Sequence, residues 1–182
     1  KSIINQREIG VDTKSYANAL KASLREAPDV ILVGEIRTRE TMEAALELSN
    51  TGHLALSTLH ANNAGQAIER VINMFPQSMH KQLLLDLSLN VRGIISQRLV
   101  KSKDGKRCAA LEILIMTPHI QDLILKGDID EIKVAMEESG KEGMQTFDTA
   151  LYNLHKEGRI ELDEALNNAS SRANLEAKIN FG

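Results

Sequence analysis

Residues 30–33 form an uninterrupted aliphatic run, Val-Ile-Leu-Val, between Pro28-Asp29 and Gly34-Glu35. Pro28 ends any preceding helix, because proline lacks the N–H group that a helix interior needs. An aliphatic run without polar alternation is typical of a strand that is covered on both faces of a parallel sheet. The run therefore predicts a buried strand whose carboxyl end presents Gly34 and Glu35 at the edge of the sheet.

Helical periodicity alternates with strand patterns around this run. Apolar residues spaced three and four apart predict helices over residues 15–27, after the N-cap Thr38, and in the segment that Pro76 ends. A second apolar segment, residues 53–60, predicts a strand between the last two helices. The order helix, strand, helix, strand, helix predicts an α/β fold with a mostly parallel sheet.

The pattern changes after Pro76. Apolar spacing predicts one long helix over residues 78–97. It is followed by a hairpin whose strands, residues 96–100 and 108–115, flank a turn at Asp104-Gly105. We expect this hairpin to extend the parallel sheet with antiparallel strands.

Every periodic segment beyond Thr117 is helical. We therefore divide the chain into an α/β part, residues 1–116, and a helical carboxyl-terminal part, residues 117–182. The last residues, 170–182, are expected to be loosely held, because chain ends often lack packing partners.

Composition excludes several classes of partner. The 182 residues carry 22 Lys and Arg against 25 Asp and Glu, and aromatic residues make up only 3%. Nucleic-acid binding needs a basic surface, and single strands also need aromatic side chains to stack on, so we expect no nucleic-acid partner. The most apolar long stretch, residues 83–95, contains Asp86 and Arg92, so we expect no insertion into a membrane. A single cysteine, Cys108, indicates a reducing compartment such as the cytosol and predicts a small buried strand residue.

Glu35 is the first candidate for chemistry. In nucleotide-hydrolysing motors, an acid at the end of an apolar strand orients a magnesium ion, through water, or the attacking water. An apolar strand that ends in a solvated acid is also common in proteins without such chemistry. The pattern by itself leaves both interpretations open.

Two histidines, His53 and His60, bracket the second predicted strand. Ligands bind α/β sheets at the carboxyl ends of the strands, so His60 is better placed for function than His53. Their separation of seven residues puts them on opposite faces of an ideal strand, which argues against a shared metal ion.

Two motifs in this order resemble those of the secretion ATPase superfamily. Residues 27–37, Ala-Pro-Asp-Val-Ile-Leu-Val-Gly-Glu-Ile-Arg, resemble its Walker B segment, and residues 51–63 resemble its His box. Four further stretches are similar to the type IV pilus retraction ATPases, the PilT/PilU family: residues 5–10, 96–99, 112–115 and 143–148. Residues 38–41, 59–64 and 170–181 resemble the PilU branch of this family more than the PilT branch. The resemblance covers essentially the whole chain.

This resemblance implies a hexameric ring of RecA-like subunits that bind ATP with Mg²⁺. In the family, hydrolysis drives pilus retraction, and with it twitching motility, from the cytoplasmic face of the inner membrane. The implied partners are other copies of the subunit, the inner-membrane platform proteins of the pilus and a partner retraction ATPase. The location is therefore expected to be cytoplasmic and peripheral to that membrane.

Roles follow from the resemblance position by position. Glu35 matches the Walker B acid, close to the attacking water and, through water, to Mg²⁺. His60 and His53 match the His-box groups that sense the γ-phosphate, and Arg37 matches a residue that braces the site. The residues expected to contact the nucleotide are Asp29, Gly34, Glu35 and His60.

Residues 117–124 match the position of the family's retraction motif but differ from it at His119, Gln121 and Asp122. Helical spacing predicts that the apolar residues of this segment, Ile120, Leu123 and Ile124, are buried. Gln121 and Asp122 fall between them and should face solvent or a partner.

No phosphate-binding loop of the pattern Gly-x-x-x-x-Gly-Lys-Ser/Thr occurs in the sequence. We expect the chain to be the carboxyl-terminal part of a longer ATPase and to be inactive by itself. A pilus assembly or type II secretion ATPase is one alternative, although such proteins commonly carry a four-cysteine zinc insertion and Cys108 stands alone. A non-catalytic interaction module is the other alternative.

Overall fold

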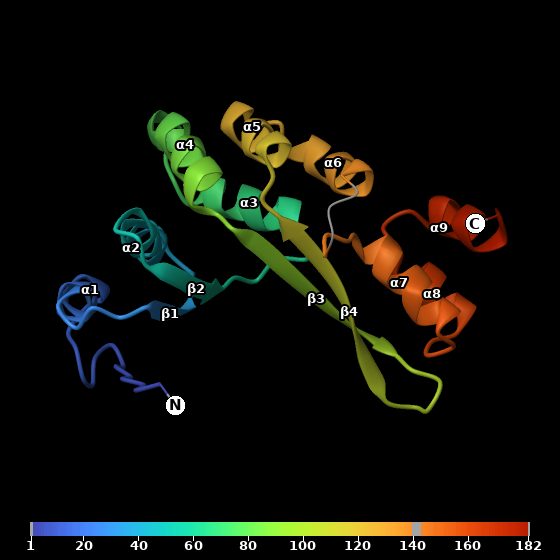
Figure 1. The fold of residues 1–182 in the computed structure, drawn as a ribbon, viewed down its shortest axis with the longest axis horizontal. Helices are drawn as coiled ribbons and strands as arrows, with labels where there is room; N and C mark the ends of the chain where they lie inside the picture. Colours follow the sequence, from blue (N-terminus) through green and yellow to red (C-terminus); the bar gives the residue numbers. More distant parts are fainter. Residues whose placement is uncertain (1, 140–142, 182) are drawn as a thin grey trace. The chain divides into compact units, whose positions relative to one another are not determined.

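The computed structural model describes residues 2–139 and 143–181, which divide into two compact units (Figure 1). The first unit contains Lys1–His60 and Val71–Asn90, and the second contains Ala61–Arg70 and Val91–Gly182. Helices and a parallel strand pair confirm the predicted α/β class. The boundary expected at Thr117 falls inside the second unit and stays a prediction.

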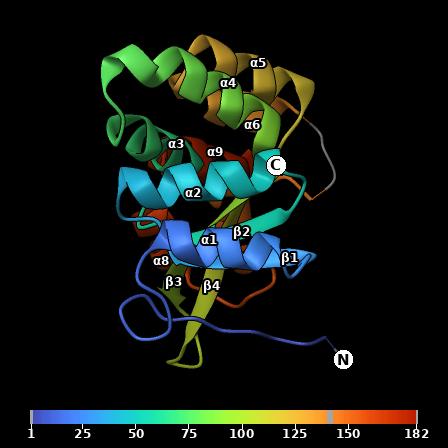
Figure 2. The same cartoon turned by 90° about the vertical axis from the view of Figure 1, so that its left-hand side faces the viewer.

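The first unit is a parallel strand pair with helices on one side. Helix α2 packs on both strands, while α1 and α4 pack against α2 (Figure 2). Thr38 caps α2 as predicted, because its hydroxyl accepts a hydrogen bond from the Thr41 N–H group. The elements are α1 (Tyr16–Leu24), β1 (Val30–Glu35), α2 (Arg39–Asn50), β2 (Leu54–Thr58) and α4 (His80–Asn90), with a short 3-10 turn at Gln77–Met79.

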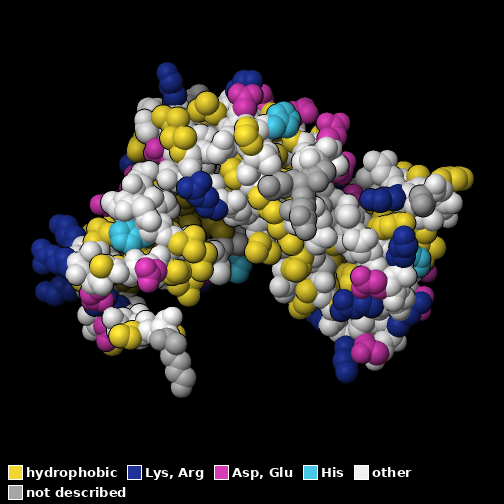
Figure 3. Space-filling view, in the orientation of Figure 1, with side chains coloured by type: hydrophobic (Ala, Val, Ile, Leu, Met, Phe, Trp, Pro, Cys, Tyr) yellow, Lys and Arg dark blue, Asp and Glu magenta, His cyan; other side chains and the backbone are white. Residues whose placement is uncertain are grey.

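The residues that the structure describes cover only one face of the β1–β2 pair, which corrects the prediction of a strand buried on both faces. Val33, on the face toward α2, is buried. On the other face Val30 pairs with Leu54 and Leu32 pairs with Leu56, and all four side chains are exposed, Leu32 to 70%. Figure 3, which colours side chains by type, shows that apolar side chains reach the surface among charged ones. The aliphatic run makes both faces of the strand apolar. It carries no information about which element, if any, packs against the second face.

The predicted long helix over residues 78–97 is wrong in its second half. Helix α4 ends at Asn90, and β3 (Gly93–Lys101) begins three residues later. Aliphatic residues at positions 91, 94 and 95 satisfy helical spacing, but β-branched residues favour a strand. Gly93 permits close strand pairing, because a Cβ atom there would lie 2.9 Å from the Leu114 carbonyl oxygen.

The predicted hairpin is confirmed, but it does not extend the parallel sheet. Strand β3 pairs antiparallel with β4 (Arg107–Ile115), and in the part of the chain that the structure describes these two form a separate sheet. Gly105 takes the positive φ of 80° that the turn requires. Cys108 lies buried on β4, as expected.

The second unit places its carboxyl-terminal helices beside the hairpin (Figure 1). One core contains Val100, Cys108 and Ala110 from the hairpin together with buried residues of the last three helices. These helices and those before them are α3 (Ala64–Asn73), α5 (Pro118–Lys126), α6 (Ile132–Glu138), α7 (Phe147–Lys156), α8 (Leu162–Asn168) and α9 (Arg172–Phe181). None of the helices over residues 2–139 and 143–181 is long and apolar enough to span a membrane.

The carboxyl-terminal segment is held more firmly than predicted. Residues of α9 contact α7 and α8, and Leu175 in α9 is only 1% exposed. The expectation of a loose tail is therefore wrong for the part of α9 around Leu175, which joins the common core, whereas Phe181 at the end of the helix is 91% exposed. Gly182 lies outside the described residues.

Helix α5 confirms the predicted buried face. Ile120 and Ile124 are fully buried and Leu123 is 8% exposed. Asp122 is exposed, and its carboxylate pairs with Lys126 at 2.6 Å, whereas Gln121 is half-buried.

Candidate active site at the sheet edge

The parallel pairing of β1 and β2 brings the carboxyl ends of both strands to one edge of the sheet. Val33 pairs with Ser57, but Glu35 pairs with Thr58, so the register shifts by one residue at Gly34. The Thr58 hydroxyl donates to the Gly34 carbonyl oxygen at 2.8 Å, and the Ile36 N–H group donates to the Thr58 carbonyl oxygen at 2.9 Å. Such bulges often re-aim side chains beside active sites, and here the bulge fixes the position of Glu35.

Glu35, Arg37 and His60 meet at this edge. The Glu35 side chain is 23% exposed, and one of its oxygens, Oε2, lies 2.6 Å from an Arg37 guanidinium nitrogen. The other oxygen, Oε1, lies 3.2 Å from His60 Nε2. The structure thus joins three of the predicted site residues through the two oxygens of one carboxylate.

The electrostatics of this group centre on the Glu35 carboxylate. The hydrogen bond to Glu35 and the negative charge of its carboxylate raise the pKa of the Arg37 guanidinium. Arg37 and His60 are largely exposed, so the polar ends of both side chains remain in contact with solvent. The geometry can hold a carboxylate in one orientation while leaving its partners accessible to a ligand.

His53 and Asp29 lie away from this group. His53 precedes β2, where its Nδ1 lies 3.0 Å from the Thr51 hydroxyl. Asp29 is exposed and precedes β1. Because a strand rises about 3.3 Å per residue, each of them is roughly 20 Å of extended chain from the opposite strand end. Their predicted roles stay proposals, and the structure does not bring them to Glu35.

The residues at the edge fit a magnesium ion that a nucleotide would also hold. Mg²⁺ in such sites takes one or two protein carboxylates and completes its shell with phosphate oxygens and water. Glu35 would act on the ion through a water molecule, and among residues 2–139 and 143–181 no three His, Cys, Asp or Glu side chains form a metal-binding cluster. Gly34 adds room beside the acid, since a Cβ atom there would meet nothing within 4 Å.

Sequence reasoning missed two polar residues that organise this region of the chain. Thr58 lies inside the His-box segment, yet its bond to the Gly34 carbonyl oxygen depends on strand pairing. Glu112 is buried, and it accepts a hydrogen bond from the Ala64 N–H group at 2.8 Å. Strand alternation gave a usable signal for Glu112, because it shares the buried face of β4 with Ala110 and Leu114.

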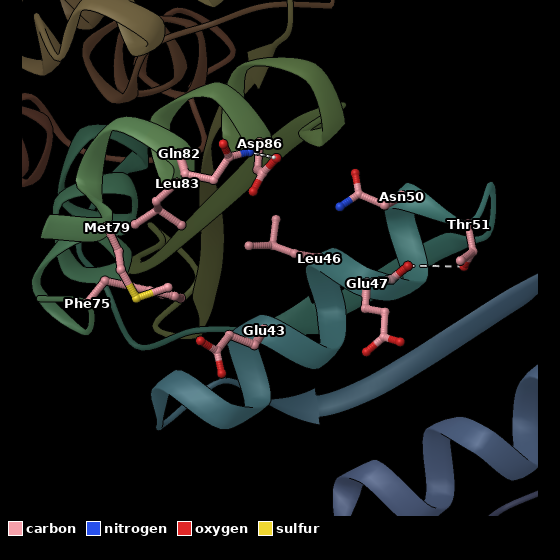
Figure 4. Close-up of a pocket in the computed structure, with 10 residues that line it drawn as sticks. All are labelled: Glu43, Leu46, Glu47, Asn50, Thr51, Phe75, Met79, Gln82, Leu83 and Asp86. Carbon is pink, nitrogen blue, oxygen red and sulfur yellow. Dashed lines mark hydrogen bonds between the residues drawn. The ribbon is translucent and has the colours of Figure 1, made fainter.

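A separate cavity of about 270 Å³ lies between α2 and the segment that contains α4 (Figure 4). Leu46, Leu83 and Phe75 contribute apolar surface, and acidic side chains lie around them. Its lining residues include neither Glu35 nor His60. This cavity is therefore distinct from the edge where the candidate catalytic groups meet.

A match to a known protein family shows which family this chain belongs to. Residues 4–177 match the model of the family described as Type II/IV secretion system protein. The chain belongs to this family. The predicted resemblance to secretion ATPases is thereby confirmed.

The family members that resemble this chain include two pilus ATPases of Pseudomonas aeruginosa. The chain is 51% identical over 181 residues to the type IV pilus ATPase PilU, a match that covers 99% of this chain and 47% of PilU. It is 40% identical over 175 residues to the type IV pilus retraction ATPase PilT, covering 96% of this chain and 51% of PilT. The predicted similarity to the PilT/PilU branch is confirmed.

The fold of the chain also matches a solved member of the family. The crystal structure of the pilus retraction motor PilT with bound ADP aligns with a TM-score of 0.84 at 43% identity, over 96% of this chain and 49% of that chain. The chain thus spans about half the length of the relatives that it matches.

Proposed function

We propose that this chain contributes the hydrolytic sheet edge of a hexameric ATPase motor that powers type IV pilus retraction. The observation that carries the proposal is the contact of one carboxylate, Glu35, with both Arg37 and His60 at the carboxyl edge of a parallel sheet. Identity to PilU over 99% of the chain supports the link to pili.

The three side chains divide the chemistry. Bound ATP would supply the phosphoryl group, and Mg²⁺ would neutralise its developing charge. Glu35 orients the attacking water through one oxygen, while Arg37 holds the other oxygen and fixes the carboxylate plane. His60 leaves Oε1 of Glu35 when it turns toward the γ-phosphate, and this exchange ties the orientation of water to the presence of ATP.

His53 takes a secondary role in this proposal. It hydrogen-bonds with Thr51 and lies at the opposite end of β2 from Glu35. Asp29 likewise lies at the far end of β1, so contact with the nucleotide falls to Gly34, Glu35 and His60, with Glu35 acting through water.

The remaining parts of the proposal concern the full-length protein. We place it at the cytoplasmic face of the inner membrane, with pilus platform proteins and a second retraction ATPase as partners and no nucleic acid. Residues 117–182 form its helical part, which passes movement from the nucleotide edge to those partners. The 182-residue chain alone does not hydrolyse ATP, since it has no phosphate-binding loop.

Replacement of the two histidines in the full-length protein tests the site. His60→Ala should lower kcat for ATP hydrolysis by at least about tenfold, since it removes the group beside Glu35. His53→Ala is the matched control and should change kcat less, because His53 lies outside the group. The reverse ranking would refute the placement of the site.

Deletion of the gene tests the direction of the motor. Cells without the protein should still assemble pili but fail to retract them, which is measured by pilus imaging and by twitching on agar. Cells without pili would instead indicate an assembly ATPase. Normal piliation and normal retraction would refute a role in either process.

A further inference from the structure

Glu112 is a buried acid that the proposed chemistry does not use. Glu112 lies in the middle of β4, directly opposite Ser96 of β3, and only 5% of its surface is exposed. Burial raises the pKa of its carboxyl group, because desolvation disfavours the charged form. An acid is retained in such an environment only when hydrogen bonds satisfy it.

Two helices supply those hydrogen bonds from their amino ends. The N–H group of Ala64, the first residue of α3, donates to Glu112 Oε1 at 2.8 Å. A backbone hydrogen bond from Phe147, the first residue of α7, also lowers the pKa of Glu112. The first N–H groups of a helix have no partner within the helix. A carboxylate can accept hydrogen bonds from them, and its negative charge is stabilised by the positive end of the helix dipole. One side chain therefore joins the amino ends of α3 and α7.

Arg98, on the neighbouring strand β3, contacts the first residue of α7 and the segment just before α3. Its guanidinium carbon lies 4.2 Å from the centre of the Phe147 ring. The same guanidinium donates to the Asn62 carbonyl oxygen at 3.5 Å and to the Asn168 carbonyl oxygen at 2.9 Å. The hairpin thus holds residues 62–64 with one cation and one acid, and both also contact Phe147.

Residues 61–64 are the segment that follows His60 along the chain. Asn63 Oδ1 accepts a hydrogen bond from the Gln66 N–H group at 2.8 Å, and α3 begins at Ala64, the last residue of this segment. A restraint on Ala64 limits where the chain can go after β2, which ends two residues before His60. The His box and the helical carboxyl-terminal part are therefore connected through the amino ends of α3 and α7.

We propose that Glu112 is a positioning residue that couples the His-box segment to α7 through the amino end of α3. This inference rests on the proposed ATPase function. Glu112 does not touch the reacting atoms; it restrains the chain that carries His60. Its acceptor oxygen, rather than its charge, is what the coupling requires, because the Ala64 N–H group needs only an oxygen to donate to.

Two substitutions at this position separate the acceptor from the charge. Glu112→Gln keeps an acceptor oxygen in the same place, whereas Glu112→Met keeps the length of the side chain but removes the oxygen. In the full-length protein we expect Glu112→Met to lower kcat for ATP hydrolysis about tenfold and to change KM for ATP less than twofold. Glu112→Gln should retain at least about a third of the wild-type kcat.

The His60→Ala background shows whether the effect passes through His60. There, Glu112→Met should lower kcat by less than about twofold, because the restraint no longer has a histidine to place. Equal losses from Glu112→Met in both backgrounds, equal losses from the Gln and Met variants, or an unchanged kcat in Glu112→Met would each overturn the proposal.

Ala64→Pro provides a second route if Glu112→Met does not fold. Proline is favoured at the first position of a helix and lacks the N–H group that Glu112 accepts. Ala64→Pro should lower kcat about tenfold, and wild-type activity in this variant would overturn the proposal. A full-length protein without ATPase activity would overturn both this proposal and the proposed function. A protein that His60→Ala impairs and Glu112→Met does not would overturn this proposal alone.

Discussion

Helix α5 offers two leucines that differ in burial and little else. Leu123 is 8% exposed and Leu125 is 48% exposed, and both lie in Pro118–Lys126. Replacement by Ala removes three carbon groups, which are worth about 0.8 kcal/mol each when fully buried. Leu123→Ala also leaves a cavity, so we expect a loss of about 2–4 kcal/mol in the free energy of unfolding. Leu125→Ala loses about half of the transfer energy and leaves no closed cavity, so we expect about 1 kcal/mol.

Thermal unfolding of the chain, followed by calorimetry or circular dichroism, measures this difference. For a chain of this size, 1 kcal/mol corresponds to roughly 2–4 °C in Tm. Leu123→Ala should therefore lower Tm by about 5–15 °C, and Leu125→Ala should lower it by about 2–4 °C. The helix propensities of Leu and Ala are similar, so they do not obscure the comparison. Equal shifts in the two variants would refute the assignment of the buried face of α5.

Three further predictions concern the surface of α5, pH and nucleotide. Joint replacement of Gln121 and Asp122 by Ala should change Tm little, because the ion pair of Asp122 with Lys126 is exposed. The same double variant should impair twitching if this face docks a partner. A stable variant protein in fully motile cells would leave the segment only a packing role. The pKa of Glu112 is raised by burial against the opposing effects of Arg98 and Lys133, so its contribution to stability is present below the ordinary value of 4.5 and is lost as the pH rises through the raised pKa. The Tm of Glu112→Gln relative to wild type should therefore increase as pH rises above about 4.5, and a constant difference from pH 4 to 8 would contradict this. Calorimetric titration of the 182-residue chain with Mg-ATP should give a Kd weaker than about 10 μM, since the sequence has no phosphate-binding loop; tighter binding would contradict this.

Local signals predicted the order of the elements in the first unit well. Pro28 fixed the start of a new element, and Thr38 caps α2 as its side-chain chemistry indicates. Glu35 and His60 were correctly expected at one edge, because parallel strands bring their carboxyl ends together. These predictions needed only neighbouring residues or the pairing of two adjacent strands.

The errors came from interactions between distant residues. The aliphatic residues between 91 and 95 fit both a helix and a strand, and pairing with β4 decides between them. Leu175 looked like part of a loose tail, but contacts of α9 with α7 and α8 bury it. Glu112 finds its partner Ala64 at a distance of 48 residues along the chain, which no local pattern contains.

Glu35→Gln in the full-length protein tests the central claim most directly. The substitution keeps the shape of the side chain and removes the charge that would orient water beside Mg²⁺. We predict that ATP still binds, with a Kd within about threefold of the wild-type value, while kcat falls by about 10² or more. An unchanged kcat would mean that Glu35 is only a partly solvated acid at the end of a strand, and the account of this sheet edge as a hydrolytic site would be wrong.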